Sequence, residues 1–112
     1  MILLMTQNDT SPSLELIIER VNVVTGASVA VDITGATVHC RIKDLQTGLY
    51  TNDGHTECNM VTPLNGEVRY DFQVGDIPSA GSYRVDVETI FANGRKETQP
   101  DELIIHARGE VS

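Results

Sequence analysis

The sequence predicts an all-β protein, an immunoglobulin-like antiparallel β-sandwich of seven or eight strands. Three observations support this prediction. Apolar and polar residues alternate with a period of two along most of the chain, and Gly, Asn, Pro and Thr interrupt the alternation about every ten residues. No apolar i, i+3, i+4 pattern extends beyond a single turn of helix. The connections are too short for helical crossovers, so the strands should be mainly antiparallel.

The turn before the longest alternating segment is typical of a tyrosine corner. Residues 76–82 contain Pro, Ser and Gly, and they deliver Tyr83 to the start of that segment. In a tyrosine corner the Tyr hydroxyl bonds back to the backbone a few residues upstream. We therefore interpret Asp76, Gly81 and Tyr83 as structural residues that position this strand and carry no chemistry.

The remaining elements follow from the same alternation. Eight extended segments are expected, at residues 14–24, 29–33, 36–43, 56–60, 67–72, 83–91, 95–99 and 103–105. Cys40, Cys58 and Met60 fall on the inward faces of their segments. Asn93-Gly94 predicts a two-residue type I′ hairpin turn. Pro100 indicates a sheet edge or a bulge, because proline has no N–H for the strand ladder.

The chain has 112 residues, which is enough for one domain. We expect an apolar N-terminal arm or edge strand at residues 1–7, the sandwich at residues 8–108 and a short tail at residues 109–112. With 40% hydrophobic residues the chain can bury a core of its own.

Charge and hydrophobicity argue against two classes of partner. The net charge of −8 disfavours binding to nucleic-acid phosphates and to anionic lipid. The apolar run Met1, Ile2, Leu3, Leu4, Met5 is too short for a membrane helix or a signal peptide, so neither membrane insertion nor export is expected. The run is either a plain short strand or an arm that pairs with a neighbouring subunit. As an arm, it should be removable without loss of folding.

The two cysteines leave two interpretations open. Cys40 and Cys58 both point inward, so they could be buried thiols that act as small apolar residues. They could also form one disulfide, provided that their strands are adjacent.

No pattern of residues indicates catalysis or a cofactor. His39, His55 and His106 fall in three different segments or at their edges, which argues against a converging metal site. The serines lack a G-x-S-x-G setting, and Asn52-Asp53-Gly54 lacks the spacing of an EF-hand loop. The protein is therefore predicted not to be an enzyme and to bind no cofactor. Tyr50 is the aromatic residue most expected to lie exposed, on a loop, where it could contact a partner.

The order of short motifs resembles a known family. In this sequence it runs through Asn8-Asp9-Thr10-Ser11-Pro12, Val31 to Val38, Arg41-Ile42-Lys43 with Thr47-Gly48, Gly66 to Tyr70, Ala80 to Val85, and Asn93 to Pro100. Together these segments resemble the N-terminal immunoglobulin-like domain of phage upper baseplate proteins, over roughly residues 8 to 106. The chain departs from the family pattern at Asn8, where the family favours Gly, in the apolar residues 1–5, and in ending with the domain.

The resemblance implies a non-enzymatic structural protein of the bacteriophage virion, made in the bacterial cytoplasm. A stand-alone copy fits a baseplate, tail or neck adaptor, or a capsid decoration protein. Its partners would be other phage structural proteins and copies of itself in a symmetric particle. The contacts would lie at strand edges, loops and termini, with residues 1–5 and Tyr50 as candidates. The alternative is an immunoglobulin-like adhesion or accessory module that binds carbohydrate or a cell-surface protein.

Overall fold

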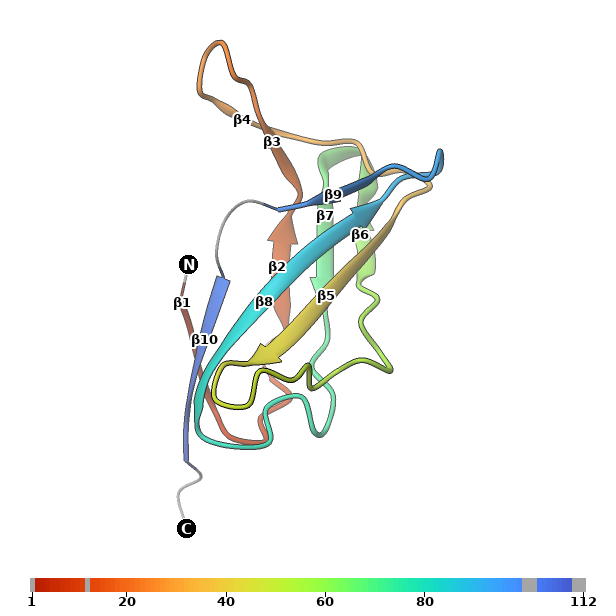
Figure 1. The fold of residues 1–112 in the computed structure, drawn as a ribbon. Helices are drawn as coiled ribbons and strands as arrows, with labels where there is room; N and C mark the ends of the chain where they lie inside the picture. The colour runs from red at the N-terminus through yellow and green to blue at the C-terminus, as the bar shows by residue number, and fades with distance from the viewer. Residues whose placement is uncertain (1, 12, 100–102, 110–112) are drawn as a thin grey trace.

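The computed structural model describes residues 2–11, 13–99 and 103–109, and in these ranges the protein is a β-sandwich (Figure 1). The all-β, immunoglobulin-like prediction is confirmed. The described ranges contain ten strands where seven or eight were expected. Two reasons account for the difference: the N-terminal residues form a strand, and the segment expected at 14–24 is divided in two at Ile18. Pro100, Met1 and most of the expected tail lie outside the described residues.

Two sheets form the sandwich. The five-stranded sheet contains β1 (Ile2–Thr6), β10 (Leu103–Arg108), β8 (Gly81–Ile90) and β5 (Thr37–Asp44) in that order, with β9 (Lys96–Thr98) also paired to β8. The three-stranded sheet has the order β2 (Leu14–Ile17), β7 (Glu67–Tyr70) and β6 (Asn59–Thr62). All pairs are antiparallel except β1 with β10, which is parallel.

A third pair of strands projects from one end of the sandwich. The antiparallel hairpin of β3 (Glu19–Val21) and β4 (Ser28–Ala30) extends beyond both sheets (Figure 1). At its base, the Ile18 N–H donates to the Gly66 carbonyl and the Val31 N–H donates to the Ile18 carbonyl. The first bond ties the hairpin to Gly66, and the Ile33 N–H donates to the carbonyl of Pro63 in the 3-10 turn η1 (Pro63–Asn65) that precedes this glycine. Gly66 has a φ of 72°, and a Cβ there would lie 2.6 Å from the Ile18 carbonyl oxygen, so only glycine fits.

The inward faces of the alternating segments form one core between the sheets. Its buried apolar residues are Met5, Leu14, Ile18, Val31, Ile33, Val38, Cys40, Ile42, Cys58, Val68, Tyr70, Phe72, Ile77, Tyr83, Val85, Val87, Leu103, Ile105 and Ala107. The longest strand, β8, alternates strictly, because every second residue from Tyr83 to Thr89 is buried. Period-two patterning therefore predicted the core face of most strands correctly.

Two local details differ from expectation. Met60 pairs with the buried Val68 and therefore lies on the predicted face, yet it is 37% exposed, because β6 is at the edge of the three-stranded sheet. The Asn93-Gly94 turn is not type I′, since of these two residues only Gly94 has a positive φ. The Gly94 N–H donates to the Phe91 carbonyl and the Phe91 N–H donates to the Arg95 carbonyl, which is the pattern of a longer hairpin loop with a left-handed glycine.

Tyr83 occupies a tyrosine corner. Its ring is buried, and its hydroxyl donates to the Ser79 carbonyl at 2.7 Å and accepts from the Ser79 N–H at 3.2 Å. Gly81 has a φ of 141°, and a Cβ there would lie 3.0 Å from the Gln46 side-chain amide. The carboxylate of Asp76 accepts from the Gln73 N–H at 2.9 Å and closes the preceding turn. These contacts set the direction in which the chain enters β8.

We expect Tyr83→Phe to lower the free energy of unfolding by about 1 kcal/mol, because the Ser79 carbonyl and N–H lose their partner. Tyr50→Phe is the matched control: its hydroxyl bonds to Asp86 at the surface, at 3.3 Å, so the change should be within about 0.5 kcal/mol. Denaturant titrations of both variants measure the difference. Equal unfolding midpoints for Tyr83→Phe and the wild type would contradict the structural role of this hydroxyl.

Candidate interaction surface and buried polar cluster

The N-terminal strand forms an open edge of the five-stranded sheet. β1 pairs with β10 on one side, and within the described residues no strand pairs with its other side. The side chains alternate: Met5 is buried and Leu3 packs against the core, whereas Ile2 is 63% and Leu4 is 74% exposed. An unpaired strand edge with exposed apolar side chains is a surface to which another chain can add.

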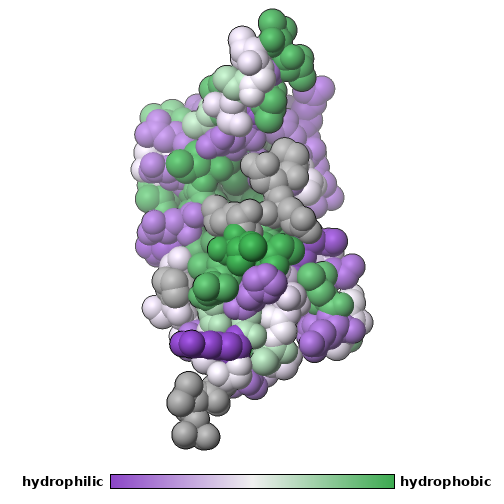
Figure 2. Space-filling view, turned by 90° about the vertical axis from the view of Figure 1, so that its left-hand side faces the viewer, coloured by the Kyte–Doolittle hydropathy of each residue, from purple (hydrophilic) through white to green (hydrophobic). Residues whose placement is uncertain are grey.

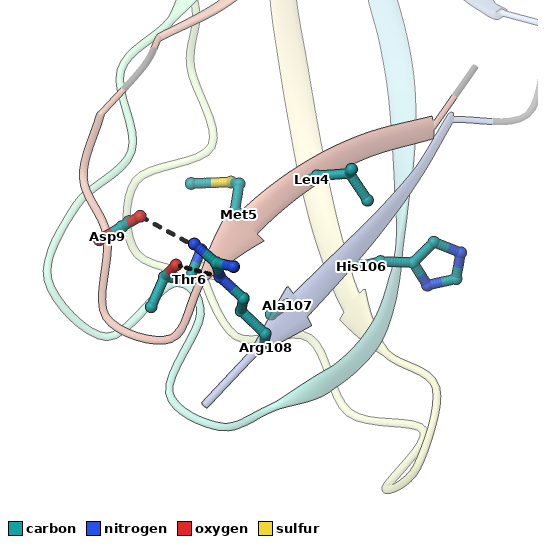
Figure 3. Close-up of a pocket in the computed structure, with 7 residues that line it drawn as sticks. All are labelled: Leu4, Met5, Thr6, Asp9, His106, Ala107 and Arg108. Atoms are coloured by element: carbon teal, nitrogen blue, oxygen red, sulfur yellow. Dashed lines mark hydrogen bonds between the residues drawn. The ribbon is translucent and has the colours of Figure 1, made fainter. Parts of the chain in front are cut away.

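A shallow hollow of about 510 Å³ lies along this edge (Figure 3). It is lined by residues of β1, β10 and the turn after β1: Leu4, Met5, Thr6, Asp9, His106, Ala107 and Arg108. The Asp9 carboxylate accepts from the Thr6 N–H at 3.1 Å, and Arg108 Nε donates to Thr6 Oγ1 at 3.2 Å. The hollow therefore combines an apolar wall with one acidic and one basic side chain that are held in fixed positions.

The predicted contact residues fall into different environments. Ile2 and Leu4 are exposed, but Leu3 and Met5 belong to the sandwich. The expectation that residues 1–5 form a dispensable arm must therefore be corrected, since their removal would delete a core side chain and a paired strand. Tyr50 is 36% exposed, and its hydroxyl and ring are engaged by Asp86 and by Lys43, whose Nζ lies 6.0 Å from the ring centroid.

The projecting hairpin is a second exposed apolar surface, and sequence reasoning missed it. Val23 and Val24 at its tip are 94% and 90% exposed, and Val21 and Val29 on its strands are at least half exposed. Figure 2 shows apolar colour at the projecting end as well as on the flank of the sandwich. Two valines directly before a Thr-Gly turn were a usable signal, because a turn offers no core for them.

A cluster of buried polar side chains joins the sheets at the other end. Asn52 lies between β5 and β6 and is fully buried. Its Oδ1 accepts from the Ile42 N–H at 2.8 Å, and its Nδ2 donates to the Cys40 carbonyl at 2.8 Å and to the Tyr70 hydroxyl at 2.9 Å. The Tyr70 hydroxyl in turn donates to Asp76 Oδ2 at 2.5 Å. The cluster thus connects the backbone of β5 with a side chain of β7 and with the turn before β8.

His55 closes this cluster at the surface. Its Nε2 lies 2.5 Å from Asp76 Oδ1, while 42% of its side chain stays exposed. His39 and His55 both line a second hollow, and His39 Nδ1 lies 2.8 Å from Thr56 Oγ1. Within the described ranges no three His, Cys, Asp or Glu side chains converge as metal ligands. His106 is on β10, between β1 and β8, with Nδ1 2.9 Å from Ser82 Oγ. The arrangement orients His55 and holds its loop against the sandwich.

The two cysteines face each other in the core. Cys40 Sγ and Cys58 Sγ are 3.1 Å apart, and both thiols are free. The structure thus places the two sulfurs in contact, across the point where the chain passes from one sheet to the other.

No helix in the described residues is long and apolar enough to cross a membrane.

Comparisons with known proteins bear on the fold. No family model matches the chain, and no curated protein matches it. Among solved structures, the crystal structure of CopC from Methylosinus trichosporium OB3b is similar, with 12% sequence identity and a TM-score of 0.55 over 98% of this chain and 86% of that one. At this identity the likeness establishes the β-sandwich fold and nothing about activity.

The buried cluster predicts a loss of stability at high pH. Burial, and then the hydrogen bond to Asp76, raise the pKa of Tyr70 well above its ordinary value. A group whose pKa is raised in the folded state stabilises that state below its unfolded pKa, about 10 for Tyr, and the contribution is lost as pH rises further. The free energy of unfolding should therefore fall above about pH 10.

Denaturation at a series of alkaline pH values measures this slope. The Cys40 thiol adds to it from about pH 8.5, because its hydrogen bond to Cys58 and its burial also raise its pKa. Tyr70→Phe isolates the phenol: this variant should be less stable at neutral pH and show a shallower alkaline slope. A slope that is identical in the two proteins would contradict the assignment to Tyr70.

Proposed function

We propose that this protein is a non-enzymatic structural component of a bacteriophage particle, a baseplate, tail or neck adaptor or a capsid decoration protein. It would dock onto neighbouring virion proteins, or onto copies of itself, through the open edge of β1. The observation that carries the proposal is the exposure of Ile2 and Leu4 on an unpaired strand edge beside a hollow. A partner strand added to β1 would gain backbone hydrogen bonds and would cover both side chains.

The motif resemblance supports the choice of phage particles. Asn8, which departs from the family's preferred Gly, has a φ of 66°, a left-handed conformation that Gly favours and Asn tolerates. The family-like segments Gly66 to Tyr70 and Ala80 to Val85 correspond to β7 with its preceding glycine and to the tyrosine corner. The left-handed conformation at Asn8 is compatible with the Gly that the family favours at this position.

The surroundings of Tyr50 weigh against the carbohydrate-binding alternative. Tyr50 would be the stacking residue, yet its ring lies beneath Lys43 and its hydroxyl is bonded to Asp86. Among the described residues, no structural observation favours an adhesion module that binds carbohydrate, and the experiment below distinguishes such a module from a virion protein.

We expect Leu4→Lys to reduce incorporation of the protein into particles by about tenfold or more, because burial of an apolar side chain contributes about 1.5–3 kcal/mol and a lysine would bring its charge into the contact. Leu64→Lys is the matched control: Leu64 is 69% exposed, but it lies in η1, away from the β1 edge. Particles purified by density gradient from cells producing each variant, followed by quantitative mass spectrometry, measure incorporation.

Both variants should fold as the wild type does, since each replaces an exposed side chain. Equal incorporation of Leu4→Lys and Leu64→Lys would contradict docking through β1. If only Val24→Lys reduced incorporation into particles, the contact would be assigned to the β3–β4 hairpin instead. Absence of the wild-type protein from particles, together with glycan or cell-surface binding, would overturn the virion proposal in favour of the adhesion module.

A further inference from the structure

Cys40 and Cys58 are placed as a pair by the backbone around them. Cys40 lies on β5, and Cys58 directly precedes β6 in the other sheet. The Cys40 N–H donates to the Thr56 carbonyl and the Cys58 N–H to the Val38 carbonyl, both at 2.8 Å. These two bonds bracket the bridge between His39 and Glu57, so the segments around the two thiols are held side by side in antiparallel alignment.

The two sulfurs are close enough to bond after a small rearrangement. Their separation is 3.1 Å, and a disulfide bond is about 2.05 Å long, so they need to approach by roughly 1 Å. We propose that Cys40 and Cys58 are a redox-closable pair that forms an intramolecular disulfide and thereby locks β5 to the segment entering the second sheet. This inference does not depend on the proposed virion role.

Burial determines the order of the chemical steps. Cys58 keeps 6% exposure and lies between two exposed residues, Glu57 and Asn59, whereas Cys40 is fully buried. The Cys58 thiolate attacks a small disulfide such as oxidised glutathione, breaks its S–S bond and releases one glutathione thiolate, which takes a proton. Cys40 then gives its proton to solvent and attacks Cys58 Sγ, which releases the second glutathione. Two protein thiols are oxidised and one glutathione disulfide is reduced to two thiols.

The disulfide would constrain the loop between residues 40 and 58, which contributes Asn52 and His55 to the buried polar cluster. The disulfide closes the segment from 40 to 58, which contains Asn52, the residue that bonds to β5 and to Tyr70, and His55, which contacts Asp76. Closure removes conformations from the unfolded chain, so the oxidised protein should be the more stable form. A reducing cytoplasm keeps both thiols reduced, whereas oxidising surroundings favour the disulfide. The redox state of the pair would therefore depend on the compartment in which the protein resides.

The purified full chain tests the proposal directly. Samples equilibrated with excess reduced or with excess oxidised glutathione are denatured in acid, alkylated and weighed by mass spectrometry. We expect two alkylated cysteines in the reduced sample and none in the oxidised one, with a peptide linking Cys40 to Cys58. The melting temperature should be higher by about 5 °C or more after oxidation.

Cys58→Ser is the control, and in this variant oxidised glutathione should leave the melting temperature unchanged. If that variant does not fold, the wild-type mass and melting data still decide. The proposal would be overturned if both thiols could still be alkylated after treatment with oxidised glutathione, both in buffer and in urea at concentrations below the unfolding transition. A disulfide that links two chains on a non-reducing gel, or an oxidised form that melts no higher than the reduced one, would do the same.

Discussion

The arrangement of the two sheets depends on the hydrogen bonds made by the buried side chain of Asn52. One amide group bonds to the N–H of Ile42 and the carbonyl of Cys40, and also reaches the hydroxyl of Tyr70 in the other sheet. Apolar contacts between sheets are non-directional and tolerate small slips, whereas an amide with three partners specifies one relative position. Asp76 extends this specification to the turn before β8, since it accepts from Tyr70 and from the Gln73 N–H. Loss of the Asn52 side chain would leave the buried Ile42 N–H and Cys40 carbonyl without this partner.

Two other parts of the molecule expose apolar side chains. Ile2 and Leu4 are exposed on β1, and Val23 and Val24 are exposed on the β3–β4 hairpin. This hairpin projects beyond the sandwich (Figure 1), and its end is coloured as apolar in Figure 2. Exposed apolar side chains at a sheet edge are a liability for an isolated protein. Their position at two separate surfaces is consistent with a chain that has neighbours on more than one side, as in a symmetric particle. The Cys40–Cys58 pair lies in a third part of the molecule, beside the loop that carries Asn52.

Sequence patterning located the strands better than it located the important polar residues. Tyr83 could be placed in a corner, because a Pro/Ser/Gly turn before a strand is a local signal. Asn52 was interpreted only as part of an Asn-Asp-Gly turn, since its burial depends on Tyr70, 18 residues away. Met60 lies opposite the buried Val68, as its alternation predicted, but it is 37% exposed because β6 is at the edge of its sheet, and the order of strands is not encoded in the alternation. Val23 and Val24 were read as the end of a strand, although they form the tip of a projecting hairpin.

The sequence by itself determined the fold class, the inward face of β5 and β8, and the net charge of −8, since these depend on alternation and composition within short windows. Only the tertiary structure decided that β1 pairs in parallel with β10, that Asn52 is buried, and that Cys40 and Cys58 touch. Each of these is a contact between segments distant along the chain. A period of two states which side of a strand faces the core, but it does not state which strand lies next to it or in what register.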